Sequence, residues 1–424
     1  MESGLTDVII TIPQKKKNPF KNDTEFNSLS YYEIFKTIFM LITGIAIIRI
    51  ILFLIILLLT TTLLIIIMMG YNPKDKDGKL QDMSSFRRYL LFIPQGLARL
   101  GLFIIGFYYI HEKYPENHKL CTYFPSYFER SDAPKIFIAN HVCFIDAIYI
   151  FTKTVPSILA QANTVNIPLM GGALRALQPI WVPVTEEQRR TLPSAKELIS
   201  ERISSSNNFT RPIVIFPEGT TKRKDMLVKF QDGAFNNMTP VQPIVFKYGG
   251  KNCDLSWTVG LTYHYMIFRL CTQFYNSLEI EYLPVIDPKG KYNTVEEFKK
   301  ITVDAFVNSG NFEVSTLTVQ DNHFLKFFKY DEIDYVCDIL YNNSNHNTSE
   351  IKQITGLNNK QIYDFIKQFI KHDTNKDGKL SRNQFVEMLS KYNIFITLNS
   401  DYITFFEIIE LFNSNTELKE KVKK

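Results

Sequence analysis

The residues best suited to chemistry lie in a short block that follows the apolar run Lys135–Ala139, where His141 precedes Asp146 by five positions. On a continuous helix such residues are about 140° out of phase. Their side chains therefore meet only if His141 lies on a turn and Asp146 on the helix that follows. A neutral imidazole is a general base near pH 7, and a carboxylate on its second nitrogen fixes the tautomer. The pair indicates general-base catalysis; the alternatives are a structural loop histidine and a nucleophilic Cys143.

A second block, Phe216–Thr221, follows another apolar run and has the sequence Phe-Pro-Glu-Gly-Thr-Thr. We expect a turn at a strand end that exposes the Glu218 carboxylate and the backbone N–H groups around Gly219. Three basic residues follow directly, at 222–224, and are suited to bind phosphate groups. The alternative is a solvated turn followed by a run of charges.

A third constellation lies near the C-terminus, where 373–384 fits a twelve-residue calcium-binding EF-hand loop through its first nine positions. The candidate ligands are Asp373, Asn375, Asp377, the Lys379 carbonyl, Ser381 and Gln384. Gln384 stands where a bidentate Glu is usual and offers one neutral oxygen, so we expect weak calcium binding. The alternative is a degenerate loop with a structural role. Such loops pair, and neither candidate partner segment, 329–350 or 393–415, contains a complete loop.

Two apolar segments must position this chemistry at a membrane. Residues 50–70 carry no charge, and a helix of that length spans about 31 Å, which matches the ~30 Å hydrocarbon core. Apolar character extends upstream to Thr37 and is interrupted by Arg49, so the segment either spans the bilayer or re-enters it as a hairpin. The second segment, Tyr89–Ile110, favours a surface-lying or re-entrant helix over a span.

The remaining pattern predicts an α/β core, because short apolar runs such as 135–139, 213–216 and 243–248 alternate with helical stretches. We expect a disordered polar arm over 1–32, a transmembrane or re-entrant segment over 33–70, a linker and membrane-associated helix over 71–125, the α/β core over 126–315 and an all-α EF-hand-like domain over 316–424. A net charge of +5 does not indicate a nucleic-acid partner, and five cysteines without a CxxC pair do not indicate a zinc site.

In order and spacing, these blocks resemble the glycerophospholipid acyltransferases. The shared features are a His-x4-Asp block at 141–146, a middle block, a Glu-Gly-Thr block at 218–220 and a Pro-containing apolar block at 239–244. Five further stretches are similar to the lysophosphatidylcholine acyltransferases and the plant-type lysophosphatidylethanolamine acyltransferases: Ile167–Gly172, Glu186–Arg190, Phe230–Tyr248, Leu255–Thr258 and Phe274–Pro288. The resemblance covers residues 35–315, and the membrane segment before the core and the EF-hand region after it are arranged as in that family.

The resemblance implies an acyl-CoA-dependent O-acyltransferase in which His141, oriented by Asp146, takes a proton from a glycerol hydroxyl of a lysophospholipid. N–H groups of the Gly219 turn would stabilise the oxyanion. The candidate substrate-binding residues are Glu218, Gly219 and Thr220, with Arg189, Arg190 and Arg223 for phosphate contact. The phosphatidic-acid-forming branch of the family has Arg where this chain has Thr221. This difference favours an acceptor with a head group, lysophosphatidylcholine or lysophosphatidylethanolamine.

Two alternatives stay open. One is the same fold acting on lysophosphatidic acid or on an ether-linked lysolipid (lyso-PAF), and the other is a catalytically inactive, calcium-responsive membrane adaptor. The implied partners are the lysophospholipid, acyl-CoA as co-substrate and the membrane itself. The resemblance implies the endoplasmic reticulum membrane as the location, with the Golgi and lipid droplets as alternatives.

Overall fold

The computed structural model describes residues 17–22, 30–72, 76, 81, 83–115, 135–162, 166, 171, 174, 176–183, 186–191, 193–204, 211–250, 253–342, 346–392, 394, 396 and 400–423. The chain divides into two compact units. The α/β unit comprises residues 22–319, and the C-terminal unit comprises residues 1–21 together with 320–424.

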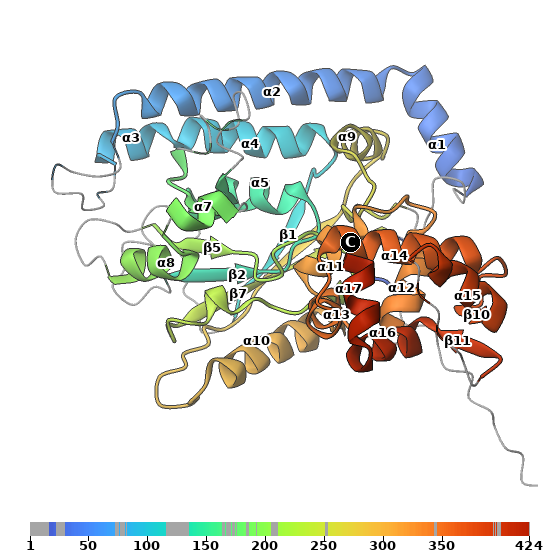
Figure 1. The fold of residues 1–424 in the computed structure, drawn as a ribbon. Coiled ribbons are helices and arrows are strands. Elements are labelled where there is room, and N and C mark those ends of the chain that lie inside the picture. The colour runs from blue at the N-terminus through green and yellow to red at the C-terminus, as the bar shows by residue number, and fades with distance from the viewer. Residues whose placement is uncertain are drawn as a thin grey trace, which may run out of the picture. The chain divides into compact units, whose positions relative to one another are not determined.

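A seven-stranded mixed sheet of order β1-β8-β7-β2-β5-β3-β4 forms the centre of the α/β unit (Figure 1). Its strands are β1 (Ile110–Lys113), β2 (Ile136–Ala139), β3 (Ser157–Gln161), β4 (Ile180–Val182), β5 (Ile213–Ile215), β7 (Val241–Tyr248) and β8 (Leu278–Tyr282). From β7 to β4 all neighbours are parallel, whereas β8 runs antiparallel to β7 and parallel to β1. A separate parallel pair joins β6 (Met226–Leu227) to β9 (Glu313–Val314).

Helices cover both faces of this sheet (Figure 1). They are α1 (Tyr31–Ile42), α2 (Ile45–Met68), α3 (Ser85–Leu90), α4 (Phe92–Ile104), α5 (Phe144–Lys153), α7 (Glu186–Thr191), α8 (Ala195–Ser204), α9 (Tyr263–Cys271) and α10 (Val295–Gly310), with a 3-10 turn η3 (Asp232–Ala234). The helices α2, α4, α5 and α9 lie on one side, and α10 lies on the other (Figure 1).

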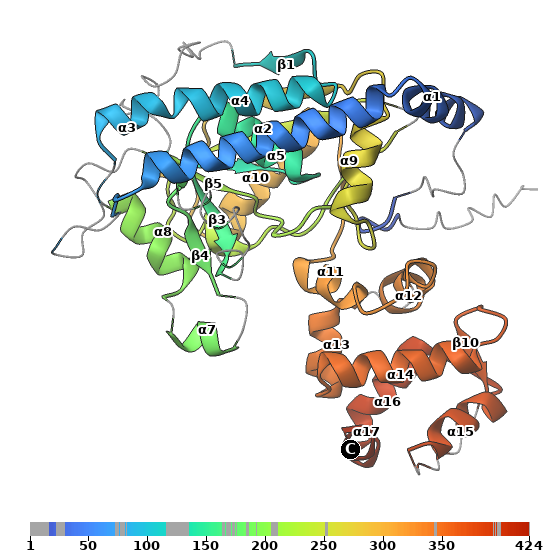
Figure 2. The ribbon, with the colours of Figure 1, turned by 90° about the horizontal axis from the view of Figure 1, so that it is seen from above.

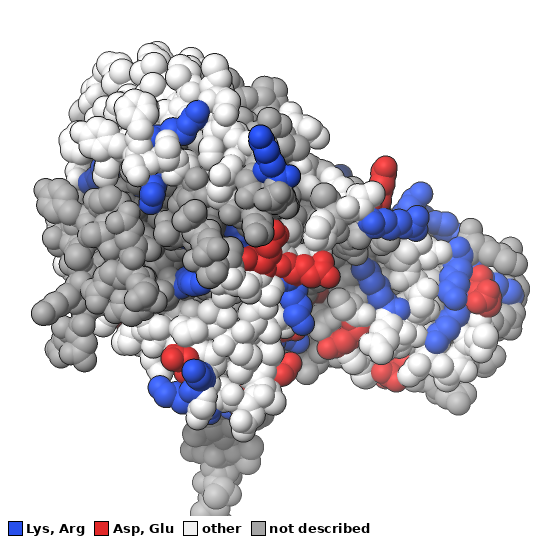
Figure 3. Space-filling model, turned by 90° about the vertical axis from the view of Figure 1, so that its left-hand side faces the viewer, with Lys and Arg blue, Asp and Glu red and all other residues white. Residues whose placement is uncertain are grey.

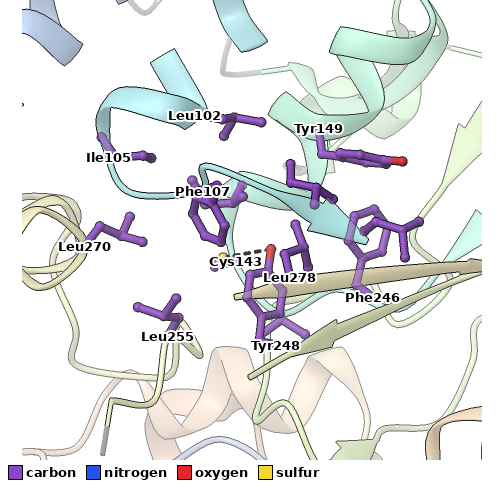
Figure 4. Packing of buried hydrophobic residues seen from close by; sticks show 14 of the residues in the cluster. Leu102, Ile105, Phe107, Cys143, Tyr149, Phe246, Tyr248, Leu255, Leu270 and Leu278 are labelled. Carbon is purple, nitrogen blue, oxygen red and sulfur yellow. Dashed lines mark hydrogen bonds between the residues drawn. The ribbon is translucent and has the colours of Figure 1, made fainter. Parts of the chain in front are cut away.

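The central strand β2 supplies side chains to both faces of the sheet. Phe137 and Ala139 join a core cluster with residues of α4, α5 and α9, part of which Figure 4 shows. Ile136 and Ile138 join the opposite cluster, with residues of α8 and α10. Strands that are buried on both faces have continuous apolar sequences, and the sequence predicts these strands from such runs. The predicted α/β core is confirmed.

Residues 33–70, expected as one span or a hairpin, fall in two helices. α1 ends at Ile42, and α2 begins at Ile45 after Gly44, whose φ of 73° favours glycine. Among the described residues, α2 is long and apolar enough to cross a membrane by its length and composition. Figures 1 and 2 show α2 beside α4 and antiparallel to it. A Cβ at Gly101 of α4 would lie 3.4 Å from Ile56 and 3.7 Å from Phe53, so the two helices are in van der Waals contact at this point.

The helix α2 is docked against the α/β unit along its length. Phe53 packs in the cluster that contains Leu102 and Tyr149. Leu64 and Ile67 pack in a cluster that contains Phe151 of α5. Phe53 and Ile67 are about 21 Å apart on a helix of 1.5 Å rise per residue. Contacts with the same unit therefore extend over most of the helix.

Arg49, the charge that interrupts the apolar run, is used to dock α2 on the end of α9. Its guanidinium donates hydrogen bonds to the carbonyl oxygens of Cys271, at 3.3 Å, and Phe274, at 3.2 Å. It also donates to the Gln273 carbonyl and to the Tyr108 hydroxyl. The last carbonyls of a helix lack intrahelical partners, so a guanidinium fork satisfies them.

The helix α1 is held on α9 by buried charges. Glu33 and Lys36 are 1% and 4% exposed, and the Lys36 ammonium donates to the Glu33 carboxylate and to Gln273. Arg269 of α9 donates to the second Glu33 oxygen at 3.2 Å. The opposite side of α1 exposes apolar residues such as Phe35 and Ile42.

The C-terminal unit is mainly helical. Its helices are α11 (Val319–Leu325), α12 (Ile333–Cys337), the π-helical η4 (Asp338–Asn342), α13 (Thr348–Thr355), α14 (Asn359–His372), α15 (Arg382–Ser390), α16 (Phe405–Ser414) and α17 (Thr416–Lys423). Rings of Phe365 and Phe369 on α14 contact Phe412 and Phe405 on α16, each pair edge-on at 5.2 Å. The all-α prediction is wrong in one respect. β10 (Lys379–Ser381) pairs antiparallel with β11 (Tyr402–Thr404), because two loops with extended backbone lie side by side.

Residues 17–21, which we expected in a disordered arm, pack within the C-terminal unit. Phe20 is fully buried, and the Lys21 ammonium lies 2.7 Å from Asp334 and 4.8 Å from the Tyr330 ring centroid. These contacts join residues more than 300 positions apart, so sequence pattern does not reveal them. Tyr31 and Tyr32, at the end of the expected arm, begin α1, and residues 1–16 and 23–29 lie outside the described residues.

Replacing Arg49 by Met is expected to destabilise the protein although it makes α2 more apolar. The carbonyls at the end of α9 would lose their charged donor, at a cost of about 2 kcal/mol in the free energy of unfolding. Denaturant unfolding of the detergent-solubilised protein measures this. Ile48→Met, at an exposed site on the same helix, is the control and should stay within about 0.5 kcal/mol of the wild type. Equal stability of the two variants would contradict the docking role.

Candidate active site

Three neighbouring parallel strands deliver the candidate residues to one edge of the sheet. β2 leads to His141, β5 leads to the turn with Glu218, and β7 ends at Tyr248. Because β5 and β7 flank β2, the chain continues to opposite sides of it. The carboxyl ends of strands at such a switch point are where α/β folds bind ligands.

His141 lies on the turn after β2 and Asp146 in the first turn of α5, the arrangement that their spacing requires. Nδ1 of His141 is 2.9 Å from Oδ2 of Asp146. The imidazole stacks on Phe216, with ring centroids 4.1 Å apart, and 21% of the His141 side chain stays exposed. The imidazole is thus held in one orientation while part of it remains open to a bound molecule.

The Asp146 carboxylate is fully buried and receives four hydrogen bonds. Besides the imidazole, Oδ2 accepts from the backbone N–H groups of Val142, at 2.6 Å, and Cys143, at 3.0 Å. Oδ1 accepts from the Tyr248 hydroxyl. These donors fix the position of the carboxylate and satisfy both of its oxygens.

Cys143 does not have the surroundings of a nucleophile. Its side chain is fully buried, and the thiol donates to the Tyr248 hydroxyl at 3.4 Å, as Figure 4 shows. Burial and the nearby Asp146 charge raise the pKa of Cys143 well above its usual value. A thiol in this state is not a thiolate at neutral pH, so the general-base interpretation of His141 is the better one.

Glu218 is not exposed on its turn, and that expectation is corrected. The carboxylate is fully buried; Oε1 accepts from the His141 backbone N–H at 2.9 Å and Oε2 from the Val228 N–H at 3.0 Å. Desolvation raises the pKa of Glu218, while Lys222 and the two backbone donors oppose that rise. Glu218 therefore positions the His141 backbone and does not face a substrate.

The Gly219 N–H is not available to an oxyanion, because it donates to the Phe216 carbonyl at 3.0 Å. Gly219 itself has a φ of 70°, which the turn requires. Thr220 is half-buried, and its hydroxyl donates to the Thr221 carbonyl at 3.3 Å. The Thr221 hydroxyl donates to the Trp257 carbonyl at 2.6 Å. These contacts shape the turn and leave the Gly219 role in oxyanion binding unsupported.

The basic run after this turn does not form an open phosphate site, and this expectation is also corrected. Lys222 is fully buried. Arg223 is 4% exposed and forms a two-pronged contact with Asp225, at 2.9 and 2.8 Å. The Lys224 ammonium donates to the Gly250 carbonyl. Internal acceptors thus use the charges that the sequence offered to a phosphate.

The other phosphate candidates, Arg189 and Arg190, lie on α7. Arg190 is exposed, and no described contact joins it to His141; the Arg189 side chain lies outside the described residues. Of the similar stretch Ile167–Gly172, only Gly171 is described.

Sequence reasoning missed two residues that support the site. Asn140, next to His141, is fully buried and pairs with the Phe246 backbone through N–H···Oδ1 at 2.8 Å and Nδ2···O at 3.0 Å. Tyr248 binds Asp146 from the end of β7. A polar residue directly after a buried strand is a sequence signal that could have identified Asn140. Nothing in the local sequence marks Tyr248, because its contact with Asp146 depends on β7 lying beside β2.

A cavity of about 260 Å³ opens where α1 meets the loops after β7 and α9. Its walls include Glu33, Lys36 and Gln273, whose polar groups bond to one another. His141 does not line this cavity. The cavity is therefore separate from the imidazole.

The candidate calcium loop joins α14 to α15 in the C-terminal unit. Oδ2 of Asp373 accepts from the Gly378 N–H at 2.8 Å and from the Tyr335 hydroxyl, whereas its buried Oδ1 has no partner among the described residues. The Gln384 amide accepts from the Ser381 N–H and donates to the His372 carbonyl, each at 2.8 Å.

The remaining candidate ligands of this loop bond to one another. Asn375 donates to Asp377 at 2.9 Å, and Asp377 in turn accepts from the Lys379 N–H at 2.9 Å. Within the described residues, no group of three or more His, Cys, Asp and Glu could hold a metal ion. The orphaned Asp373 oxygen fits a cation, while two carboxylates and neutral donors fit calcium weakly.

Comparison with known proteins gives this geometry a family context. Residues 117–247 match the family model described as Acyltransferase. The chain is 32% identical over 287 residues to Lysophospholipid acyltransferase LPEAT2 of Arabidopsis thaliana. The aligned region covers 67% of this chain and 48% of that protein. It is 36% identical over 158 residues to Lysophosphatidylcholine acyltransferase of Drosophila melanogaster, covering 37% of this chain and 29% of that protein.

Among solved structures, the 1-acyl-sn-glycerophosphate (LPA) acyltransferase PlsC from Thermotoga maritima overlaps with a TM-score of 0.38 at 15% identity, covering 66% of this chain and 94% of that one. The chain spans about half or less of the length of the two relatives named above. The matched segment contains His141, Asp146 and Glu218, so the acyltransferase resemblance is confirmed for the part of the chain that holds the site.

Proposed function

We propose that this protein is an acyl-CoA-dependent O-acyltransferase that re-acylates a lysophospholipid at a membrane. The observation that carries the proposal is the contact between His141 Nδ1 and the buried Asp146 carboxylate, at 2.9 Å, within the segment that matches the Acyltransferase model. The relatives named for lysophospholipid and lysophosphatidylcholine substrates support the acceptor class.

In the proposed reaction, Nε2 of His141 takes the proton of a free glycerol hydroxyl. The hydroxyl oxygen bonds to the thioester carbonyl carbon of acyl-CoA, the carbon–sulfur bond breaks, and the imidazolium returns its proton to the CoA thiolate. Asp146 stabilises the transient imidazolium, because its negative charge is 2.9 Å from Nδ1. General-base help of this kind contributes about 10²–10⁴-fold to the rate.

A head-group-bearing acceptor fits the turn better than a phosphomonoester does. Thr221 stands where the phosphatidic-acid-forming branch has Arg, and Asp225 already holds the Arg223 guanidinium. A guanidinium fork is the usual partner of a dianionic phosphate. We therefore propose lysophosphatidylcholine or lysophosphatidylethanolamine as acceptor, with lysophosphatidic acid and ether-linked lysolipid as alternatives. A catalytically inactive adaptor is disfavoured, because the imidazole and its carboxylate are in contact.

We further propose that α1, α2 and α4 lie in the membrane interface. Packing of one side of α2 on the same unit over about 21 Å favours a helix that lies along the bilayer surface over one that crosses the ~30 Å hydrocarbon core. The outward side of α2 exposes apolar residues, among them Ile47, Ile51, Leu54, Ile55, Leu58 and Leu59. On the face shown in Figure 3, the top, where α2 and α4 lie in Figure 1, carries few charged side chains. This surface supports a membrane location; the endoplasmic reticulum is proposed from the family resemblance, with the Golgi and lipid droplets as alternatives.

Calcium is proposed as a weak ligand of the loop between α14 and α15. The support is the partnerless oxygen of Asp373, together with the fit of 373–384 to an EF-hand loop. The antiparallel pair β10–β11 places the segment 402–404 beside this loop, which supports an EF-hand-like pairing with one of the expected partner segments.

The reaction is tested with membranes that carry the full chain and labelled acyl-CoA, against lysophosphatidylcholine, lysophosphatidylethanolamine, lysophosphatidic acid and an ether lysolipid. His141→Ala should lower kcat about 10²–10⁴-fold because the base is lost. His111→Ala, at an exposed histidine on β1, is the matched control and should leave the rate unchanged. Transfer that survives His141→Ala, or no transfer to any acceptor, would refute the proposal.

The membrane arrangement is tested by single cysteines before and after α2. Tyr31→Cys and Ser85→Cys, each in a Cys121→Ser background, are exposed positions, while the described native cysteines are buried. In sealed vesicles a membrane-impermeant maleimide should label both variants or neither, because both ends of α2 lie on one side. Labelling of one variant alone, with both labelled after permeabilisation, would show that α2 crosses the bilayer.

The calcium proposal is tested by Gln384→Glu, measured by calorimetric titration of the full chain with calcium. A carboxylate at position 12 supplies a second oxygen and a negative charge, so the dissociation constant should fall about tenfold or more. Glu387→Gln, at an exposed site on the same helix α15, should leave it unchanged. If the Gln384→Glu variant also binds no calcium, the loop has a structural role and the calcium proposal is wrong.

A further inference from the structure

Lys222 is a fully buried lysine behind the candidate active site. Its ammonium has no hydrogen-bond partner among the described residues. It lies 3.6 Å from Oε1 of Glu218 and 5.3 Å from the centroid of the Phe312 ring. A buried ammonium is retained where a negative charge compensates it. Glu218 is the carboxylate in ion-pair range of Lys222 among the described residues.

The other charged groups around Lys222 already have partners. Asp225, on the same segment, is held by Arg223 through two hydrogen bonds. Asp146, on α5, is bonded to His141 and to three further donors. Burial lowers the pKa of Lys222, and the charges of Glu218, Asp146 and Asp225 oppose that fall. Glu218 instead has two backbone N–H donors and needs a counter-ion.

Glu218 and Lys222 together hold the peptide groups of His141 from both sides. The His141 N–H donates to Oε1 of Glu218 at 2.9 Å, and the His141 carbonyl accepts from the Lys222 backbone N–H at 3.2 Å. The second Glu218 oxygen accepts from Val228. An ionised carboxylate accepts on both oxygens, whereas a protonated one carries a hydroxyl on one of them. The position of the His141 turn thus depends on the charge state of Glu218.

We propose that Lys222 is a positioning residue: its buried ammonium is the counter-ion that keeps Glu218 ionised, and Glu218 in turn holds the His141 turn in its reactive position. The inference deepens the proposed acyl transfer and, as far as activity is concerned, rests on it. It assigns to Lys222 a role distinct from the phosphate contact that the basic run suggested.

The sign of the pH effect follows from the surroundings of Glu218. Burial raises the pKa of Glu218, and the Lys222 charge opposes that rise. Without the ammonium the ionised form is less favourable, so the pKa of Glu218 rises further. Protonation then weakens a hydrogen bond to the His141 turn at a higher pH. The acid side of the activity profile should move to higher pH.

The test compares the pH dependence of kcat and KM for Lys222→Met with that of Lys229→Met, an exposed lysine seven residues away. For Lys222→Met, the pH of half-maximal activity on the acid side should rise by about 1–3 units. This is the pKa shift that an opposite charge at this separation produces in a protein interior. kcat should fall more than KM changes, because the base is displaced while the substrate surfaces remain. Lys229→Met should match the wild type.

A second background shows whether the effect passes through Glu218. In Glu218→Gln the titrating carboxylate is absent, so adding Lys222→Met should produce no further shift of the acid side. A shift that persists in this background means that Lys222 acts directly on His141 and overturns the inference. An unshifted profile for Lys222→Met alone also overturns it.

A readout without activity separates this inference from the proposed function. If the wild type transfers no acyl group, the acyltransferase proposal fails while the charge pair can still be measured by thermal unfolding. A folded-state pKa of Glu218 raised above its unfolded value confers stability that is lost as the pH rises. Between about pH 5 and pH 8, Lys222→Met should therefore lose thermal stability faster than Lys229→Met. Equal slopes would overturn the counter-ion role.

Discussion

The buried carboxylate of Asp146 is the group around which the site is organised. A carboxylate without water must be satisfied by protein donors, and here two backbone N–H groups, a tyrosine hydroxyl and an imidazole supply them. The backbone donors require a tight turn between β2 and α5, and Tyr248 joins that turn to the end of β7. The orientation of His141 follows from the same requirement, since its Nδ1 supplies the fourth donor.

Compensation of buried charge recurs through the α/β unit and explains why few of its charges face a ligand. The pairs and clusters are Glu218 with Lys222, Arg223 with the partly exposed Asp225, and Glu33 with Lys36 and Arg269. Arg269 joins α9 to Glu33 of α1, whereas the other three pairs lie within four residues along the chain. Composition therefore overstates the positive charge available to a phosphate. The helix α2 follows a related rule, because apolar residues occupy both its packed side and its exposed side.

Much of the fold could be predicted because its signals are local. The buried strands β2, β5 and β7 were recognised from continuous apolar runs, and the helix that carries Asp146 from the spacing of a short motif. The contact between His141 and Asp146 needed a turn and one helical turn, both encoded within seven residues. The two helices α1 and α2 were seen as one apolar stretch, since a bend at Gly44 leaves hydropathy unchanged.

The sequence by itself determined the residues available for general-base chemistry, the α/β class of the core and the apolar segments before it. Tertiary structure alone decided that Glu218 and Lys222 are buried, that Tyr248 binds Asp146, that Arg49 docks on α9 and that Phe20 packs in the C-terminal unit. The physical reason is the distance along the chain over which each kind of interaction acts. Strand and helix patterns reflect burial of each residue along its own element, whereas the partner of a buried charge is chosen by which distant segments the sheet and its helices bring together.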